Sequence, residues 1–228
     1  MLDPLADLQQ LEGVPSAVAA AMAAVDAVLR DRGHRTVRHE ESARALLAAG
    51  HASAELTGEA ERWLAGLTRL YAELPELAAM IRVAPAQVLA RSHLLAARGV
   101  VASDDLLGRL RSEPAVAARM ADLGRLLRMP TEASGVVLGA VAHAEIAVVE
   151  PFGSGDKAIG RAVEHMVLIS TGVDPYGLIS CEAGHAKDPA RYAAALRGYR
   201  DNGAVGVRAW LQHCAAALVQ GAETFSRA

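Results

Sequence analysis

The chain has 228 residues, of which 52% are hydrophobic, 21% are charged and 4% are aromatic. Alanine and leucine dominate the apolar residues, a composition that suits closely packed helices and argues against a β-sandwich. A net charge of −3 excludes a strongly basic surface, and every long apolar run is interrupted by a charge. We therefore expect neither nucleic acid nor a membrane among the partners.

The cysteine content and the first residues of the chain indicate the cellular compartment in which the protein is expected. Two cysteines, Cys181 and Cys214, give no disulfide framework, so we expect a reducing compartment, the cytoplasm. The opening MLDPLADLQQLEG has acids ahead of any apolar run and lacks the pattern of a signal peptide. No repeat or low-complexity linker is visible, so we predict one domain over 1–228, with N-terminal helices over 1–85.

Apolar residues recur at helical spacing along almost the whole chain. Helices are predicted over residues 15–33, 39–49, 59–74, 86–97, 103–111, 114–127, 132–149, 157–171, 189–199 and 205–220. Pro75 is expected to end one helix, and Ser103 and Thr131 to cap two others. The stretch 172–189 is expected to be non-helical, and short β-like runs occur only at 147–149 and 178–181. The predicted fold class is therefore all-α.

The segment VVEPFGSGDKAIGRAVEHMVL, residues 148–168, places a glycine-rich turn before a helix. Gly153 and Gly155 allow close backbone approach, and the first amides of a helix attract anions. Lys157 and Arg161 lie four residues apart and share a helix face, where they add positive charge. The turn is either a cradle for nucleotide phosphates or a helix connection whose glycines only relieve crowding.

The longer segment GAVAHAEIAVVEPFGSGDKAIGRA resembles the core of the Fic (filamentation induced by cAMP) family. In that family a helix carrying Ala-His runs into the motif His-Pro-Phe-x-Asp-Gly-Asn-Gly-Arg-x-x-Arg. The downstream sequence, with its Gly-x-Pro turn and closing helix, extends the similarity, so that the Fic-like core covers about 86–220. The matching residues are Ala142, His143, Pro151, Phe152, Gly155 and Arg161.

Several motif positions differ from the family pattern. Glu150 stands where the family has its general base, and Ser154 replaces the acid that holds a metal ion. The motif asparagine, second glycine and first arginine are replaced by Asp156, Lys157 and Ala158. The family's β-hairpin flap, which holds the target by strand pairing, is expected to be absent or reduced, because 108–127 reads as helix throughout.

A second similarity lies upstream. Many family members carry an inhibitory helix, Ser/Thr-x-x-x-Glu-Gly, whose glutamate pairs with the second motif arginine. Ser53 and Gly58 match its two ends, but Thr57 stands where the glutamate would be. The segment is therefore either a pseudo-inhibitory motif or an ordinary cap of the helix that follows, and both interpretations stay open.

Two functions remain open. The chain is either a non-catalytic Fic-like module that binds a nucleotide or a protein partner, or a transferase that moves AMP or a related group to a hydroxyl. In the transferase, Glu150 is the base, with a pKa raised by partial burial behind the apolar helix. The residues expected to bind the anion are Gly153, Ser154, Gly155, Asp156, Lys157 and Arg161.

Charge argues against ordinary ATP binding. A carboxylate about 4 Å from a phosphate is repelled by roughly 4 kcal/mol at an effective dielectric of about 20. Glu150 and Asp156 can ligate a bridging cation, but nothing in the sequence requires a metal there. No cofactor is required either; ATP with Mg²⁺ is the one that the resemblance implies. Alanine-rich helix surfaces also permit a homodimer.

The remaining histidines give weaker signals. Cys181 and His185 are four residues apart, but two ligands do not make a zinc site, so His185 is expected to lie in a loop. His93 and His143 fall on apolar helix faces. We expect both to be hydrogen-bonded histidines of the core.

Overall fold

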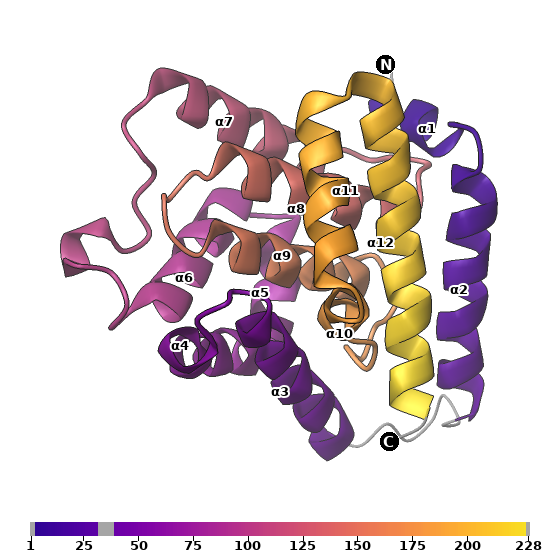
Figure 1. The fold of residues 1–228 in the computed structure, drawn as a ribbon, viewed down its shortest axis with the longest axis horizontal. Coiled ribbons are helices and arrows are strands. Elements are labelled where there is room, and N and C mark those ends of the chain that lie inside the picture. The colour runs from indigo at the N-terminus through magenta and orange to yellow at the C-terminus, as the bar shows by residue number, and fades with distance from the viewer. Residues whose placement is uncertain (1–2, 32–38, 227–228) are drawn as a thin grey trace.

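The computed structural model describes residues 3–31 and 39–226, and it contains no strand within these ranges (Figure 1). The all-α class is thus confirmed, and the described residues contain no flap hairpin. The helices are α1 (Pro4–Gln9), α2 (Val14–Asp31), α3 (His39–Glu55), α4 (Ala60–Ala72), α5 (Leu74–Ile81), α6 (Pro85–Ala97), α7 (Pro114–Arg128), α8 (Gly135–Val149), α9 (Asp156–Ser170), α10 (Cys181–Ala186), α11 (Pro189–Asp201) and α12 (Gly203–Ser226), with a 3₁₀ turn over Asp104–Leu106.

Helix α8 lies at the centre because it is apolar all round, and nearly all of its residues are buried. It packs along α9, and the glycine-rich loop joins the two. The backbones come close at Gly160 of α9, where a Cβ would lie 2.8 Å from the carbonyl oxygen of His143. Side chains on the facing sides of α8 and α9 are consequently shut off from water.

The other helices surround this pair (Figure 1). Helix α12 lies between α2 and α11 and also contacts α10, whereas α4 packs against α3 and α6. Buried apolar residues from α1 through α12 belong to a single cluster. Among the helices of the described ranges, none has both the length and the apolar character needed to cross a bilayer.

Two helix ends differ from prediction. Pro75 does not end the helix over 59–74; it occupies the first turn of α5, where a missing amide costs nothing. Helix α8 begins later than predicted, with Ser134 as its cap. The hydroxyl of Thr131, the predicted cap, instead donates to the carboxylate of Asp3 at 2.9 Å.

Two segments also have a different secondary structure. The predicted helix over 103–111 is only a 3₁₀ turn, although Ser103 does cap it. Residues 107–113 are not helical, so the prediction of helix throughout 108–127 is wrong for its first part. Helix α10 lies inside the stretch 172–189 that was expected to be non-helical. The predicted helix end at Gly33 falls outside the described residues.

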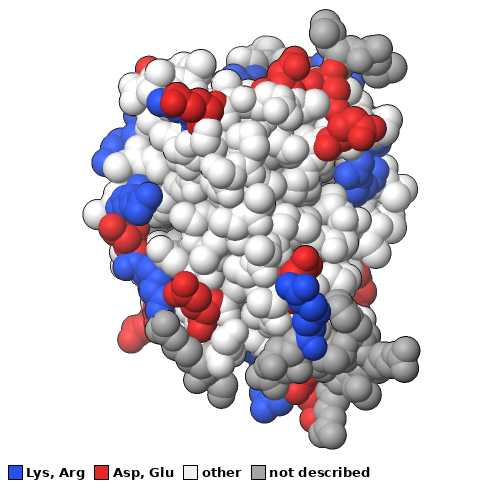
Figure 2. Space-filling view, turned by 90° about the vertical axis from the view of Figure 1, so that its right-hand side faces the viewer, with Lys and Arg blue, Asp and Glu red and all other residues white. Residues whose placement is uncertain are grey.

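One side of the molecule is uncharged across its centre, with acidic and basic residues at its margins (Figure 2). Helix α2 lies on this side (Figure 1), and its exposed residues between Pro15 and Ala27 are mostly small. An alanine surface of this kind is what the homodimer prediction rests on. That prediction stays open.

Substitution of Gly66 in α4 tests whether α4 packs closely against α6. A Cβ at Gly66 would clash with the carbonyl oxygen of Ala96 in α6, whereas one at Gly124 of α7 would meet only Pro85 at 3.6 Å. Gly66→Ala should lower the free energy of unfolding by about 3 kcal/mol. Gly124→Ala should leave it unchanged or raise it by about 0.5–1 kcal/mol. Urea unfolding followed by circular dichroism measures both, and equal effects would contradict the close packing.

Candidate functional site

The loop between α8 and α9 turns on three residues in the left-handed region. Glu150 ends α8 with φ 51°, and Gly153 and Gly155 follow with φ 73° and 68°. The amide of Phe152 donates to Oδ1 of Asp156 at 2.8 Å, and the amides of Gly153 and Asp156 also face this carboxyl group. The loop amides therefore converge, and the acidic group on which they converge belongs to the chain itself.

The carboxyl group of Asp156 has an unusual pKa. Its pKa is raised from 3.8 to about 6, mainly by burial and also by the charge of Glu150, while hydrogen bonds from the surrounding amides act in the opposite direction. Desolvation is the largest cause because only 5% of the residue is exposed. Asp156 thus ionises in a range where an ordinary aspartate is already charged.

Arg111 covers the loop from outside. Its guanidinium donates to the carbonyl oxygens of Glu150 at 2.8 Å and Val149 at 3.0 Å, and its amide donates to that of Pro151 at 2.8 Å. These bonds satisfy carbonyls that the end of α8 leaves without helical partners. The non-helical segment 107–113 therefore secures the position where the family's catalytic motif would begin.

His93 of α6 supports the loop from inside. Its ring stacks on Phe152 with centroids 4.3 Å apart, and its Nδ1 accepts the amide of Gly108 at 2.8 Å. Burial lowers the pKa of His93 to about 4, so the ring is neutral at pH 7 and its Nε2 carries the proton. Nε2 then donates to Oγ of Ser154 at 3.1 Å, and Ser154 is held by this contact. The prediction of a hydrogen-bonded core histidine is confirmed for His93.

Arg161 is buried and points into the protein. Its Nε donates to Oγ of Ser53 at 3.0 Å, its Nη2 to the carbonyl oxygen of Ser53 at 2.9 Å, and its Nη1 to Oη of Tyr192 at 3.2 Å. All three partners are neutral, and no carboxylate of the described residues forms an ion pair with the guanidinium. The arginine is therefore fully desolvated without an adjacent counter-charge.

The end of α3 thus does meet the second motif arginine, through Ser53. Thr57 takes no part in this contact: its hydroxyl donates to the carbonyl oxygen of Ala54 at 2.6 Å and accepts the amide of Glu59 at 3.1 Å. Gly58, with φ 76°, completes the turn into α4. Each of the two interpretations of this segment therefore fits a different residue. Ser53 contacts the second motif arginine, as a pseudo-inhibitory motif would, whereas Thr57 accepts an amide at the turn into α4, as a cap would.

These elements enclose an open pocket of about 590 Å³. Trp63 covers Gly155, where a Cβ would come within 2.7 Å of the indole ring. Glu150 and Lys157 are exposed on the pocket wall. The expected partial burial of Glu150 is therefore wrong: the residue follows the last buried turn of α8 and is exposed. The other lining residues include Glu59, Arg62, Phe152, Gly153, Ser154, Asp156, Ala158 and Arg161.

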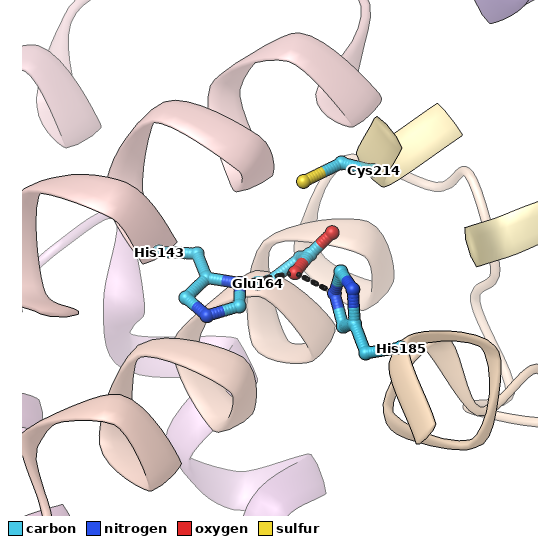
Figure 3. Close-up of side chains that lie close together, drawn as sticks. All are labelled: His143, Glu164, His185 and Cys214. Carbon is cyan, nitrogen blue, oxygen red and sulfur yellow. Dashed lines mark hydrogen bonds and ion pairs between the residues drawn. The ribbon is translucent and has the colours of Figure 1, made fainter. Parts of the chain in front are cut away.

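A buried polar network extends from Arg161 into the core, and Figure 3 shows its inner members His143, Glu164 and His185. Oη of Tyr192 contacts Nε2 of His143 at 3.0 Å, and Nδ1 of His143 contacts Oε2 of Glu164 at 2.6 Å. The same oxygen contacts Nε2 of His185 at 3.0 Å, and Nδ1 of His185 lies 3.1 Å from Nε2 of His213. The prediction for His143 as a hydrogen-bonded core residue is confirmed, whereas His185 is a buried helical residue and not a loop histidine.

Two groups of buried side chains bring metal-ligating atoms within 4.8 Å of one another. The first is His143, Glu164, His185 and Cys214, and the second is His165, Cys181 and Glu182. Sequence analysis did not find either group. The four members of the first group come from four helices, and the second group joins His165 of α9 to the adjacent Cys181 and Glu182 of α10. Local spacing in the sequence therefore reveals neither group; the available signal was the presence of charged residues and histidines within apolar helices.

No family model and no curated protein matches the chain. Solved structures do match, among them the crystal structure of a Fic family protein from Desulfovibrio desulfuricans G20, with a TM-score of 0.68 at 18% identity. The chain has a Fic-like fold. The match covers 92% of this chain and 74% of that one. The fold expected from the sequence resemblance is thereby confirmed.

Within the Fic-like fold, the positions quoted for the resemblance lie together. Pro151 and Phe152 open the loop, His143 lies on α8 behind it and Arg161 lies on α9. The roles of the loop residues in binding or catalysis stay predictions. Ser154, Asp156 and Arg161 each form a hydrogen bond with another group of the chain.

Asp156 should make folding stability depend on pH. Between pH 4 and 6 the folded chain holds a proton on Asp156 that the unfolded chain, with an aspartate pKa of 3.8, has released. Stability therefore falls as pH rises through this window. In Asp156→Asn that fall should disappear, leaving the variant up to about 3 kcal/mol more stable than the unmutated chain above pH 6.

Urea unfolding at pH 4, 5, 6 and 7.5 measures this difference. Asp26→Asn, which changes an exposed carboxylate on α2, is the matched control and should not alter the slope. A loss of stability in Asp156→Asn that is equal at all four pH values would contradict the raised pKa.

Proposed function

We propose that this Fic-like chain binds a phosphate-bearing ligand, a nucleotide, in the loop pocket and does not transfer it. The observation that carries the proposal is Arg161, a buried cation on the pocket wall that is bonded only to neutral groups. Burying a cation without a paired anion is costly. A phosphate in the pocket would offset that cost.

The donors for such a ligand are present. A guanidinium has five N–H groups, and Arg161 uses three of them within the chain. The amides of Lys157 and Ala158, at the start of α9, have no acceptor among the described residues. A helix start contributes roughly half a positive charge, and the exposed ammonium of Lys157 adds a full one. Together they favour an anion next to Arg161.

The groups needed for transfer are missing or otherwise engaged. Ser154, at the position of the metal-holding acid, is bonded to His93. Ala158, at the position of the first arginine, has no charge to place on a phosphate. Asp156 is held by the loop amides, and both it and Glu150 repel a polyphosphate. We therefore expect a ligand with few phosphates to bind at least as well as ATP.

A second candidate function is transfer of AMP or a related group with Glu150 as base. It is favoured by one observation, that the exposed carboxylate of Glu150 lines the same pocket as Arg161. An exposed carboxylate is a weaker base than an imidazole that titrates near neutral pH. This candidate therefore needs direct evidence of turnover.

Calorimetric titration with AMP, ADP and ATP, each with and without Mg²⁺, tests the proposed function. Binding should not require Mg²⁺ and should weaken by about tenfold or more in Arg161→Gln, because charge-assisted hydrogen bonds are lost. Arg62→Gln, which changes an exposed arginine of the same pocket paired with Glu59, should bind normally. Absence of binding by all three nucleotides would refute the proposal and leave a protein-binding role.

Incubation with labelled ATP and a cell lysate separates the two candidates. We expect no label on any protein, with or without Mn²⁺. Transfer that is abolished in Glu150→Gln but persists in Glu59→Gln would establish the transferase instead. The Glu59 variant is a suitable control because Glu59 lines the same pocket from the opposite side, at the N-cap position of α4.

A further inference from the structure

We propose that His143, Glu164, His185 and Cys214 form a binding site for a divalent transition-metal ion, with Zn²⁺ the best suited. The four side chains come from α8, α9, α10 and α12 and converge on one point in the core (Figure 3). All four are buried, and their ligand atoms lie within 4.8 Å of one another. The site is separate from the loop pocket and does not depend on the proposed function.

The donor set selects the class of metal. Two imidazole nitrogens, one carboxylate oxygen and one sulfur suit Zn²⁺ and its neighbours in the first transition row. Mg²⁺ and Ca²⁺ bind through oxygen and are not suited to it. A divalent ion, the Glu164 carboxylate and a Cys214 thiolate sum to zero charge, which removes the main cost of an ion in the core.

The distances permit tetrahedral ligation after small side-chain movements. Ligand atoms around a zinc ion with bonds of about 2.0–2.3 Å lie roughly 3.3–3.8 Å apart. Nδ1 of His143 and Nε2 of His185 lie 2.6 and 3.0 Å from Oε2 of Glu164. These two contacts would have to open by roughly 0.3–1.2 Å.

The far nitrogens of both rings have partners of the kind that metal-bound histidines use. Nε2 of His143 lies 3.0 Å from Oη of Tyr192, and Nδ1 of His185 lies 3.1 Å from Nε2 of His213. With the ion bound, each ring carries its proton on the far nitrogen and donates it to that partner. These contacts fix the orientation of the two ligands.

Proton balance follows from the same contacts. Each imidazole ligand shifts its proton from the ligating nitrogen to the far one and binds the ion through a lone pair, and His213 moves its own proton from Nε2 to Nδ1 so that its Nε2 can accept from His185. The thiol of Cys214 loses its proton to solvent as its sulfur coordinates the ion, so uptake releases one proton per chain without any redox change. All four ligands come from the protein, and the site is therefore structural, tying α8, α9, α10 and α12 together.

Metal analysis of the untagged chain, purified without chelators, is the first test. We expect one transition-metal ion per chain. After stripping and refolding with Co²⁺, the chain should show visible bands of a tetrahedral cobalt site and a near-ultraviolet sulfur-to-cobalt band. Cys214→Ser should lose the near-ultraviolet band, whereas Cys181→Ser, which changes the other buried free cysteine, should keep it.

X-ray absorption at the zinc edge identifies the atoms bound to the metal in the unmutated chain, so the result does not depend on whether a variant folds. We expect one sulfur neighbour and otherwise nitrogen or oxygen neighbours, at about 2.0–2.3 Å. The proposal is overturned if the chain carries no metal and takes up no Co²⁺. It is also overturned if the sulfur band survives Cys214→Ser, or if Cys181→Ser alone removes it, because the ion would then lie near His165 and Glu182.

Discussion

The structure depends on placing polar and charged groups inside a core built mainly from leucine, alanine and valine. Helices α8 and α9 approach closely, and Arg161, His143 and Glu164 are enclosed between them and their neighbours. A buried polar group without a partner costs about 1–3 kcal/mol, so each must be satisfied by another helix. Ser53 of α3 and Tyr192 of α11 do this for Arg161. The network consequently sets how these helices are arranged around α8.

The same requirement explains the loop. A turn that exposes several amides to one point needs an acceptor there, and Asp156 supplies it from the first residue of α9. Shape is preserved by glycines and by internal hydrogen bonds, whereas chemistry depends on which groups remain free to meet a ligand. Arg161 contributes to both the shape and the chemistry of the site, because it hydrogen-bonds to Ser53 and Tyr192 in the core and also lines the pocket.

Much of the fold could be predicted from local patterns. The apolar period of 3.6 residues located most helices, because burying one face of a helix is decided within a few turns. The errors arose where local signals have two meanings. Pro75 can end one helix or begin the next, and Thr131 precedes the start of α8 by four residues and is bonded to Asp3, a residue distant in sequence. Helix α10 is too short for a periodic pattern, so it was missed.

The sequence by itself determined the all-α class, the glycine-rich turn before α9 and the identity of the residues on that turn. These follow from propensity, periodicity and spacing, which act over a few residues. Only the tertiary structure decided what those residues contact: Arg161 meets Ser53, which is 108 positions away, and Glu164 joins His143 to His185. Such contacts depend on how whole helices pack, and no local pattern in the chain encodes which distant side chains share one buried space.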